Sequence, residues 1–211
     1  LERHSFARYC DQILLPGISM VAAEQRTGQL ENTQAAHIRS TIADVAATLT
    51  PVSSEPMRKR RRGRVSLLDA NVGAHLRKMR EARLGRWQGS LDVPSHSIVL
   101  CAGLGTERDD LLTELLVRSL RELDVDARSV VIGADQDNPG PDKADLISTV
   151  FLIYPVESTL EQWQRVADEL RAGLPNALLV TIRLPFGETA ANQDVVQEHV
   201  DMVLRSFEES L

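Results

Sequence analysis

The sequence predicts an α/β fold, in which an open parallel-sheet domain follows a small helical module. After residue 97, short apolar runs with strand character alternate with amphipathic helical periods, whereas the first 50 residues show only helical spacing. The apolar runs are continuous, as is typical of parallel strands that are buried on both faces. Gly103 and Gly105 follow the first run, at the place where such a domain turns from strand to helix.

The composition limits the class of protein. The 211 residues include 24 Lys and Arg against 30 Asp and Glu, a net charge of −6, which argues against general binding of nucleic acid. Cys10 and Cys101 form no disulfide framework or CxxC pattern, so we expect a reducing compartment. No stretch approaches the roughly 20 apolar residues of a membrane span. Because the chain starts at Leu1 and not at Met, we expect a soluble fragment of a longer protein.

Residues 1–50 are predicted to form a helical cap module. Apolar residues recur at helical spacing over residues 4–27, where Pro16-Gly17 predicts a kink or a break. A second helix is expected to begin after an N-cap at Thr33. Because two helices alone cannot bury both faces, we expect this pair to pack on the second domain, on a partner copy or on a missing segment.

Residues 51–96 are predicted to form a basic linker with a short amphipathic helix over 69–84. Pro, Ser and a block of like charges indicate a linker or mobile loop at residues 51–66. The block could contact anionic lipid headgroups, which attract each basic residue by about 1 kcal/mol near a membrane. Its residues are Arg58, Lys59, Arg60, Arg61, Arg62 and Arg64. The alternatives are a solvated loop and nucleic acid, although no aromatic side chains are interleaved for stacking.

The α/β domain is expected to span residues 97–211. Its strands are predicted at 98–102, 127–132, 146–154 and 177–184, and its first two helices at 111–123 and 160–173. A last helix is predicted to carry the apolar residues from Val195 to Phe207. Residues 134–145 are too polar and too rich in proline for a full helix. This order is that of a Rossmann- or flavodoxin-like domain, in which ligands bind beyond the carboxyl ends of the strands.

The loop after the first predicted strand, Gly103-Leu104-Gly105-Thr106-Glu107-Arg108, starts like a dinucleotide-binding fingerprint. Arg108 stands at the third glycine position, and the carboxylates around it would repel a pyrophosphate. Consecutive acids at this position favour a helix start over a metal site or an acid pair. The five histidines show no metal-ligand spacing, and no Ser or Cys lies in a G-x-S-x-G context. We therefore expect no catalytic residue, metal or cofactor.

The helical pair, the linker and the parallel domain together resemble a cobalamin-binding module with a helical cap and a Rossmann-like domain. Placing His37 on the histidine of that family's cap motif puts Ala36 at its glutamate and Arg26 at its tryptophan. The family's lower ligand comes from Asp-x-His-x-x-Gly after the first strand, where this chain has Glu107-Arg108-Asp109-Asp110-Leu111-Leu112. The resemblance therefore implies a cobalamin-binding-like architecture that lacks the cobalt ligand.

A second resemblance rests on Tyr9-Cys10-Asp11-Gln12-Ile13-Leu14-Leu15-Pro16-Gly17, followed by Ala22-Ala23-Glu24 and Gly28-Gln29-Leu30. This pattern is similar to the cytosolic C-terminal extension of some autoinducer-2 exporter family permeases, which are multi-pass membrane proteins. The resemblance implies a location on the cytoplasmic side of the cell membrane, with the membrane portion of the parent protein as a partner. The long basic block departs from the family's pattern.

Together these features predict a non-catalytic cytosolic domain of a membrane transporter, with a regulatory, assembly or small-ligand-sensing role. The alternatives are a soluble cobalamin- or nucleotide-binding sensor or transcriptional co-regulator, and an enzyme on the same scaffold. The helical pair also makes a homodimer an expectation. A ligand would bind at the carboxyl ends of the strands. The candidate residues are Gly103, Gly105, Thr106, Glu107, Asp109, Tyr154, Glu157, Ser158 and Arg183, with Arg26 and His37 above them.

Overall fold

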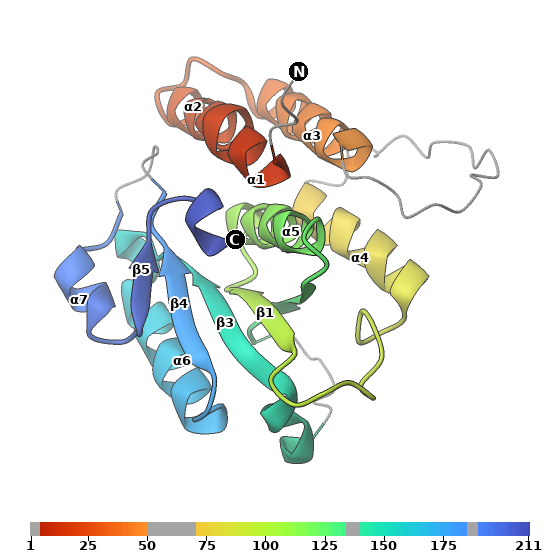
Figure 1. Cartoon of the computed structure of the whole chain (residues 1–211). Coiled ribbons are helices and arrows are strands. Elements are labelled where there is room, and N and C mark those ends of the chain that lie inside the picture. Colours follow the sequence, from red (N-terminus) through yellow and green to blue (C-terminus); the bar gives the residue numbers. More distant parts are fainter. Residues whose placement is uncertain (1–4, 50–70, 134–139, 185–189) are drawn as a thin grey trace.

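The computed structural model describes residues 5–49, 71–133, 140–184 and 190–211 (Figure 1). Its centre is a five-stranded parallel sheet with the strand order β2-β1-β3-β4-β5. The strands are β1 (Ile98–Gly103), β2 (Asp126–Val131), β3 (Ile147–Ile153), β4 (Leu178–Ile182) and β5 (Met202–Leu204). The predicted α/β class, with helices preceding a parallel sheet, is confirmed.

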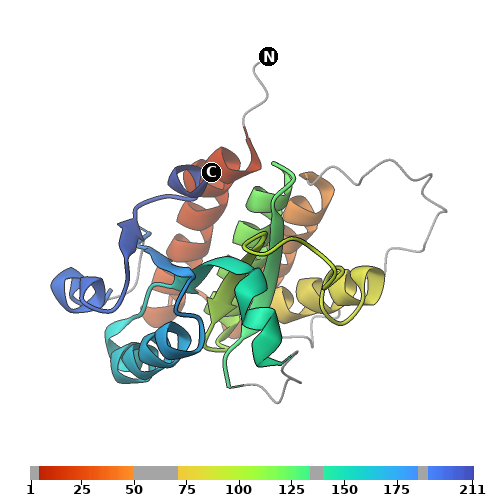
Figure 2. The same cartoon turned by 60° about the horizontal axis from the view of Figure 1, so that its bottom comes forward.

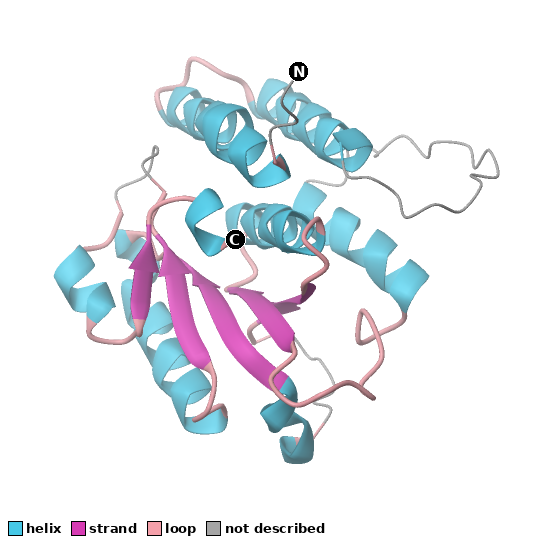
Figure 3. Ribbon diagram, viewed as in Figure 1, coloured by secondary structure: helices cyan, strands magenta, loops and turns pink. Residues whose placement is uncertain are grey.

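Helices cover both faces of the sheet (Figures 1 and 3). On one face, the apolar side chains of α5 (Glu107–Arg121) form a core with Cys101, Phe151 and Ile153. On the other face, α6 (Leu160–Gly173) buries Trp163 against a second apolar cluster. Each strand of the middle of the sheet therefore contributes to two cores, which explains why its apolar runs are continuous.

The N-terminal helices form a further layer outside α5, as Figure 2 shows from a second direction. This layer consists of α1 (Phe6–Tyr9), a π-helical turn (Cys10–Leu14), α2 (Leu15–Arg26) and α3 (Asn32–Leu49). Phe6, Leu14 and Ile42 belong to the same apolar core as the leucines of α5. Of the three packing partners considered for the helical pair, the α/β part of the same chain is therefore one that the structure provides.

The helix does not break at Pro16-Gly17, because a wide π-helical turn precedes the proline. The amide of Leu15 donates to the carbonyl oxygen of Cys10, five residues earlier. A proline inside a regular α-helix lacks an N–H and clashes with the carbonyl four residues before it. The extra residue in the π turn relieves that clash, so Pro16 sits within the first turn of α2 and the helix continues.

The single last helix predicted over Val195–Phe207 is wrong. The segment instead forms the short helix α7 (Gln193–Gln197), then strand β5, then a 3-10 turn (Glu208–Ser210). Its apolar run fits the periodicity of a helix and that of a strand, and pairing with β4 stabilises the strand. The amide of Asp201 donates to the carbonyl oxygen of Leu179 at 2.8 Å, and the amide of Arg183 donates to that of Leu204 at 2.7 Å.

Helix α4 (Val72–Leu84) is fastened to the first turn of α5. The side chain of Asn71 caps α4 and also donates to Oδ2 of Asp110 at 2.6 Å, while Arg77 Nη1 lies 2.9 Å from Oδ1 of the same carboxylate. Gly73 packs directly on this turn, since a Cβ there would lie 2.2 Å from the carbonyl carbon of Asp110. The short helix expected over 69–84 is thus part of the folded core.

A buried ion pair adds to this attachment. Arg80 Nη2 on α4 lies 3.0 Å from Oε2 of Glu114 on α5, and the two side chains are 6% and 1% exposed. The same Nη2 donates to the hydroxyl of Ser129 on β2 at 2.7 Å, and Arg118 Nε lies 3.1 Å from the other oxygen of Glu114. Burial lowers the pKa of Arg80, and the nearby carboxylate of Glu114 opposes that shift.

The outer edge of β2 is paired by a side chain and not by a strand. The amide group of Gln88 donates from Nε2 to the carbonyl oxygen of Ser129 at 2.8 Å and accepts from the amide of Ser129 at 2.9 Å. Next to it, Arg128 donates to the carbonyl oxygens of Trp87 and Ser90 and pairs with Asp126. The segment after α4 therefore satisfies polar groups of β2 that an edge strand would leave open.

The connection between β2 and β3 contains a short 3-10 helix (Pro141–Leu146). Residues 140–146 form no α-helix, which agrees with their polar and proline-rich sequence. Within the described parts of the chain, no helix is both long and apolar enough to cross a membrane. The six basic residues from Arg58 to Arg64 lie outside the described residues.

Candidate functional site

The strand order creates a crevice at the carboxyl ends of β1 and β3. The chain leaves β1 into α5 on one face of the sheet and leaves β3 into α6 on the other face, so the two connections diverge. Open α/β sheets bind ligands at such a switch point. Here the structure has a cavity of about 490 Å³. Its lining is Leu104, Thr106, Arg108, Asp109, Ile153, Tyr154, Pro155, Val156, Glu157, Ser158 and Thr159.

Two glycines shape the loop that forms one wall of this cavity. Gly105 has a φ of +78°, in the left-handed region that side chains disfavour, and a Cβ there would lie 3.0 Å from a methyl group of Val131. A Cβ on Gly103 would lie 2.8 Å from the Cβ of Asp109. The glycines therefore allow a tight turn and a close start of α5 against β1, without providing a third glycine for a dinucleotide.

Thr106 and Asp109 at the start of α5 stabilise the loop itself. Thr106 caps the helix, because its hydroxyl accepts from the amide of Asp109 at 3.0 Å. Asp109 in turn accepts from the amide of Leu104 at 3.0 Å through Oδ2 and lies 3.2 Å from Arg108 Nη1 through Oδ1. Burial raises the pKa of Asp109, and these hydrogen bonds and Arg108 oppose the shift. Asp109 therefore closes the loop and is engaged on both oxygens.

Arg108 joins the two walls of the cavity. Its Nη1 donates to the backbone carbonyl oxygen of Tyr154 at the end of β3, at 3.2 Å, while it also pairs with Asp109. Arg108 is not among the candidate ligand residues that the sequence predicts, because in the sequence it stands out only as the residue that interrupts the glycine pattern. Its position one residue into the first turn of α5, facing the neighbouring strand end, was the signal available.

Tyr154 forms the floor between the cavity and Arg183. Its ring is 2% exposed, its hydroxyl donates to the carbonyl oxygen of Ala191 at 2.9 Å, and burial raises its pKa. The guanidinium of Arg183 lies 5.8 Å from the ring centroid and donates from Nη1 to Oε1 of Gln193 at 2.5 Å. Arg183 therefore stacks beside the ring without lining the cavity, in a cation–π arrangement.

The structure brings five of the predicted site residues together in the cavity lining. They are Thr106, Asp109, Tyr154, Glu157 and Ser158. Glu107 is exposed at the first position of α5 and is not part of this lining.

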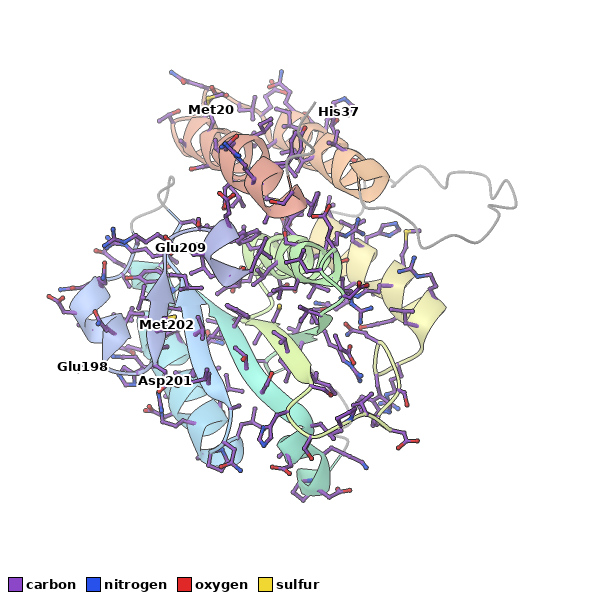
Figure 4. The ribbon with its side chains drawn as sticks, in the orientation of Figure 1. Met20, His37, Glu198, Asp201, Met202 and Glu209 are labelled. Carbon is purple, nitrogen blue, oxygen red and sulfur yellow. The ribbon has the colours of Figure 1, made fainter. Side chains whose placement is uncertain are left out.

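The two predicted cap residues do not join them. His37 is exposed on α3 and lies on the outer face of the helical layer, away from the sheet (Figure 4). Arg26 ends α2, and its side chain lies outside the described residues. The residues that line the cavity all come from the α/β part of the chain.

Metal-binding side chains and cysteine thiols are two kinds of group that could support catalysis. No group of three or more His, Cys, Asp and Glu side chains among them could hold a metal ion. Both cysteines are fully buried, and burial raises the pKa of Cys10 to about 12 and that of Cys101 even further. A thiol with such a pKa stays protonated near neutral pH and is a poor nucleophile.

A second hollow of about 760 Å³ lies on the other side of the sheet, between β2, the 3-10 helix and α6. Its walls include Leu100, Val130 and Leu170, and Arg86 and Lys143 are among its charged residues. Both ends of the segment 134–139, which the structure does not describe, meet this hollow at Gly133 and Gly140. All the residues that line the first cavity belong to the described part of the chain.

No protein-family model matches the chain, and no curated protein matches its sequence with significant similarity. The function of the chain is therefore inferred from the geometry of the cavity and from the sequence.

Proposed function

We propose that this chain is a non-catalytic sensing domain that binds a small ligand in the cavity between β1 and β3. One observation carries the proposal: the cavity lies at the switch point of the sheet, with apolar walls and a few polar groups. Small-molecule sites have this composition, in which apolar walls supply affinity and a few polar groups fix orientation. Leu104, Ile153 and Val156 provide the walls, and Ser158 and Thr159 provide hydroxyl groups.

The hydrogen bonds of the lining favour binding over catalysis. Both carboxylate oxygens of Asp109 are held by the loop and by Arg108, and the hydroxyl of Tyr154 is held by Ala191. A general base needs a free lone pair within reach of the proton that it removes. The polar groups that are buried at the cavity are instead used to fix its shape.

The attachment of α4 supports a regulatory role. Asp109 and Asp110 are neighbours in the first turn of α5; Asp109 closes the cavity loop, and Asp110 binds Asn71 and Arg77 of the α4 segment. A ligand that displaces Arg108 or Asp109 would shift this turn. Because Gly73 is in direct contact with it, α4 would have to move as well.

We also propose that the domain belongs to a membrane transporter and faces the cytoplasm. The support for this proposal is the pattern of residues 9–30 described above. Cell fractionation of the full-length protein tests it, together with the sequence upstream of Leu1. Membrane fractions and upstream apolar segments of roughly 20 residues are expected. A full-length protein found only in the soluble fraction would contradict the proposal.

A thermal-shift screen tests the sensing function. The fluorescence of Trp163 reports unfolding, since its ring is fully buried and its Nε1 donates to the carbonyl oxygen of Ile153 beside the cavity. A metabolite at 100 times its dissociation constant stabilises the fold by about 2.7 kcal/mol, which raises the melting temperature by about 5–11 °C in a chain of this size. The panel includes cobalamins and nucleotides.

Two tryptophan variants localise any response. Ser158→Trp fills the cavity from its rim and is expected to abolish the shift, whereas Ser95→Trp changes another exposed serine, before the amino end of β1, and is expected to preserve it. A panel without any response, or a response that survives Ser158→Trp, would refute ligand binding at this cavity and leave assembly as the better explanation.

A further inference from the structure

Helix α2 and the π-helical turn before it present an apolar surface that the other described residues leave uncovered. Residues 12–23 contain no charged side chain, although charged residues make up 26% of the protein. Leu14 and Leu15 are buried beneath the helix, but Ile13 is 54% exposed and Met20 is 63% exposed. Figure 4 shows Met20 on the outer face of the helical layer, away from the sheet.

Gly17 lies between these two residues in the sequence, and none of the described residues packs closely against it. A Cβ added there would meet nothing within 4 Å. Glycine within a helix costs about 1 kcal/mol relative to alanine, so the fold gains nothing from it at this position. A glycine on an exposed helical face does allow another backbone to approach closely.

We propose that α2 is the interface of a homodimer, in which the α2 helices of two copies cross antiparallel at Gly17. Gly17 and Met20 are three residues apart in α2, so they share one side of the helix. Ile13 lies in the π-helical turn directly before α2 and is exposed like Met20. A two-fold axis near Gly17 places Ile13 of each copy against Met20 of the other. The surface is therefore complementary to itself, as a two-fold interface requires.

The charges at the ends of the uncharged stretch determine the direction. Arg8 lies before it and Glu24 lies after it, and both are half-buried. An antiparallel crossing brings Arg8 of one copy near Glu24 of the other at both ends of the interface. A parallel crossing would bring like charges together, which is unfavourable.

Sedimentation equilibrium of the chain over a range of micromolar concentrations tests the dimer. The unmodified protein is expected to dimerise, and Met20→Glu is expected to raise the dissociation constant by about two orders of magnitude, because it places an unpaired charge in an apolar contact. Met79→Glu is the matched control, since Met79 is 60% exposed on α4. A monomeric wild type, or equal effects of the two substitutions, would overturn the proposal.

Cross-linking and charge exchange test the crossing point and the direction. Both natural cysteines are buried, so Gly17→Cys introduces an accessible thiol close to the axis, and mild oxidation is expected to yield a covalent dimer. Met79→Cys is expected to stay uncoupled. Arg8→Glu and Glu24→Arg are each expected to weaken dimerisation, and the double variant is expected to restore it. A double variant as weak as the single ones would exclude the antiparallel pairing.

Discussion

Gly73→Ala tests whether α4 is a rigid part of the α/β core. The added Cβ would lie 2.2 Å from the carbonyl carbon and 2.5 Å from the carbonyl oxygen of Asp110. An ordinary contact between carbon atoms is about 3.5–4.0 Å, so the new methyl group falls short by more than an ångström. The opposing atoms are backbone, and no side chain can turn away to make room. Helix α4 would have to move outward.

The cost follows from what that movement disturbs. Overpacking a tight contact costs about 1–3 kcal/mol of folding stability. We expect a value near the upper end of this range, because the outward shift of α4 also stretches the hydrogen bonds from Asn71 and Arg77 to Asp110. Alanine returns up to about 1 kcal/mol through its helix propensity. The net loss is about 2 kcal/mol, which lowers the melting temperature by about 4–8 °C for a chain of this length.

Circular dichroism melts and urea unfolding of both proteins measure this loss. Gly173→Ala is the control, since that glycine ends α6 and a Cβ there would meet nothing within 4 Å. We expect the control to match or slightly exceed the wild type. If Gly73→Ala proved as stable as Gly173→Ala, then α4 would not be pressed on α5, and the proposed mechanical link from the cavity to α4 would fail with it.

Three further substitutions test the charges and the sheet edge. Glu114→Leu leaves Arg80 buried without its ion-pair partner and is expected to cost about 3–5 kcal/mol by urea unfolding, while the double variant with Arg80→Met is expected to recover most of that loss. A double variant no more stable than the single one would contradict this. Because burial raises the pKa of Asp109, its stabilising contribution is present at low pH and is lost as the pH rises through the raised value. Asp109→Asn is therefore expected to gain stability relative to the wild type between about pH 4 and pH 7, and a constant difference across this range would refute the sign. Gln88→Ala leaves the amide and carbonyl of Ser129 unpaired and is expected to cost about 1–3 kcal/mol, with stronger light scattering on heating; an unchanged melt would show that water replaces the side chain.

The secondary structure could be predicted from the sequence wherever a local pattern of residues is compatible with only one kind of element. Strands β1 and β3 are short apolar runs that end at Gly103 and before Pro155, which favours strands over helices, and their observed limits lie within one residue of the predicted ones. The segment from Val195 to Phe207 has no such constraint. Its strand forms because the edge of β4 offers hydrogen bonds to residues 201–204, a contact between segments that periodicity does not contain.

The site divides in the same way. The loop after β1 and the end of β3 could be predicted to meet, because parallel strands place their carboxyl ends at one edge of the sheet. The partner of Asp110 could not be predicted, since Asn71 is 39 residues away and its contact depends on how α4 packs. The role of Arg108 could not be predicted either. In the sequence it only interrupts a glycine pattern, whereas in the structure it donates to the carbonyl oxygen of Tyr154 on another strand.

The amide of Gln88 has a consequence for how this protein can assemble. An open strand edge is a template on which another chain can extend the sheet, and repeated extension leads to fibres. Along β2 that template is already occupied at Ser129 by one side chain, at the cost of holding Gln88 at a φ of +60°. Growth of the sheet is thus hindered at this position of β2, whereas the two-fold helical contact proposed above would close on itself and stop at two copies.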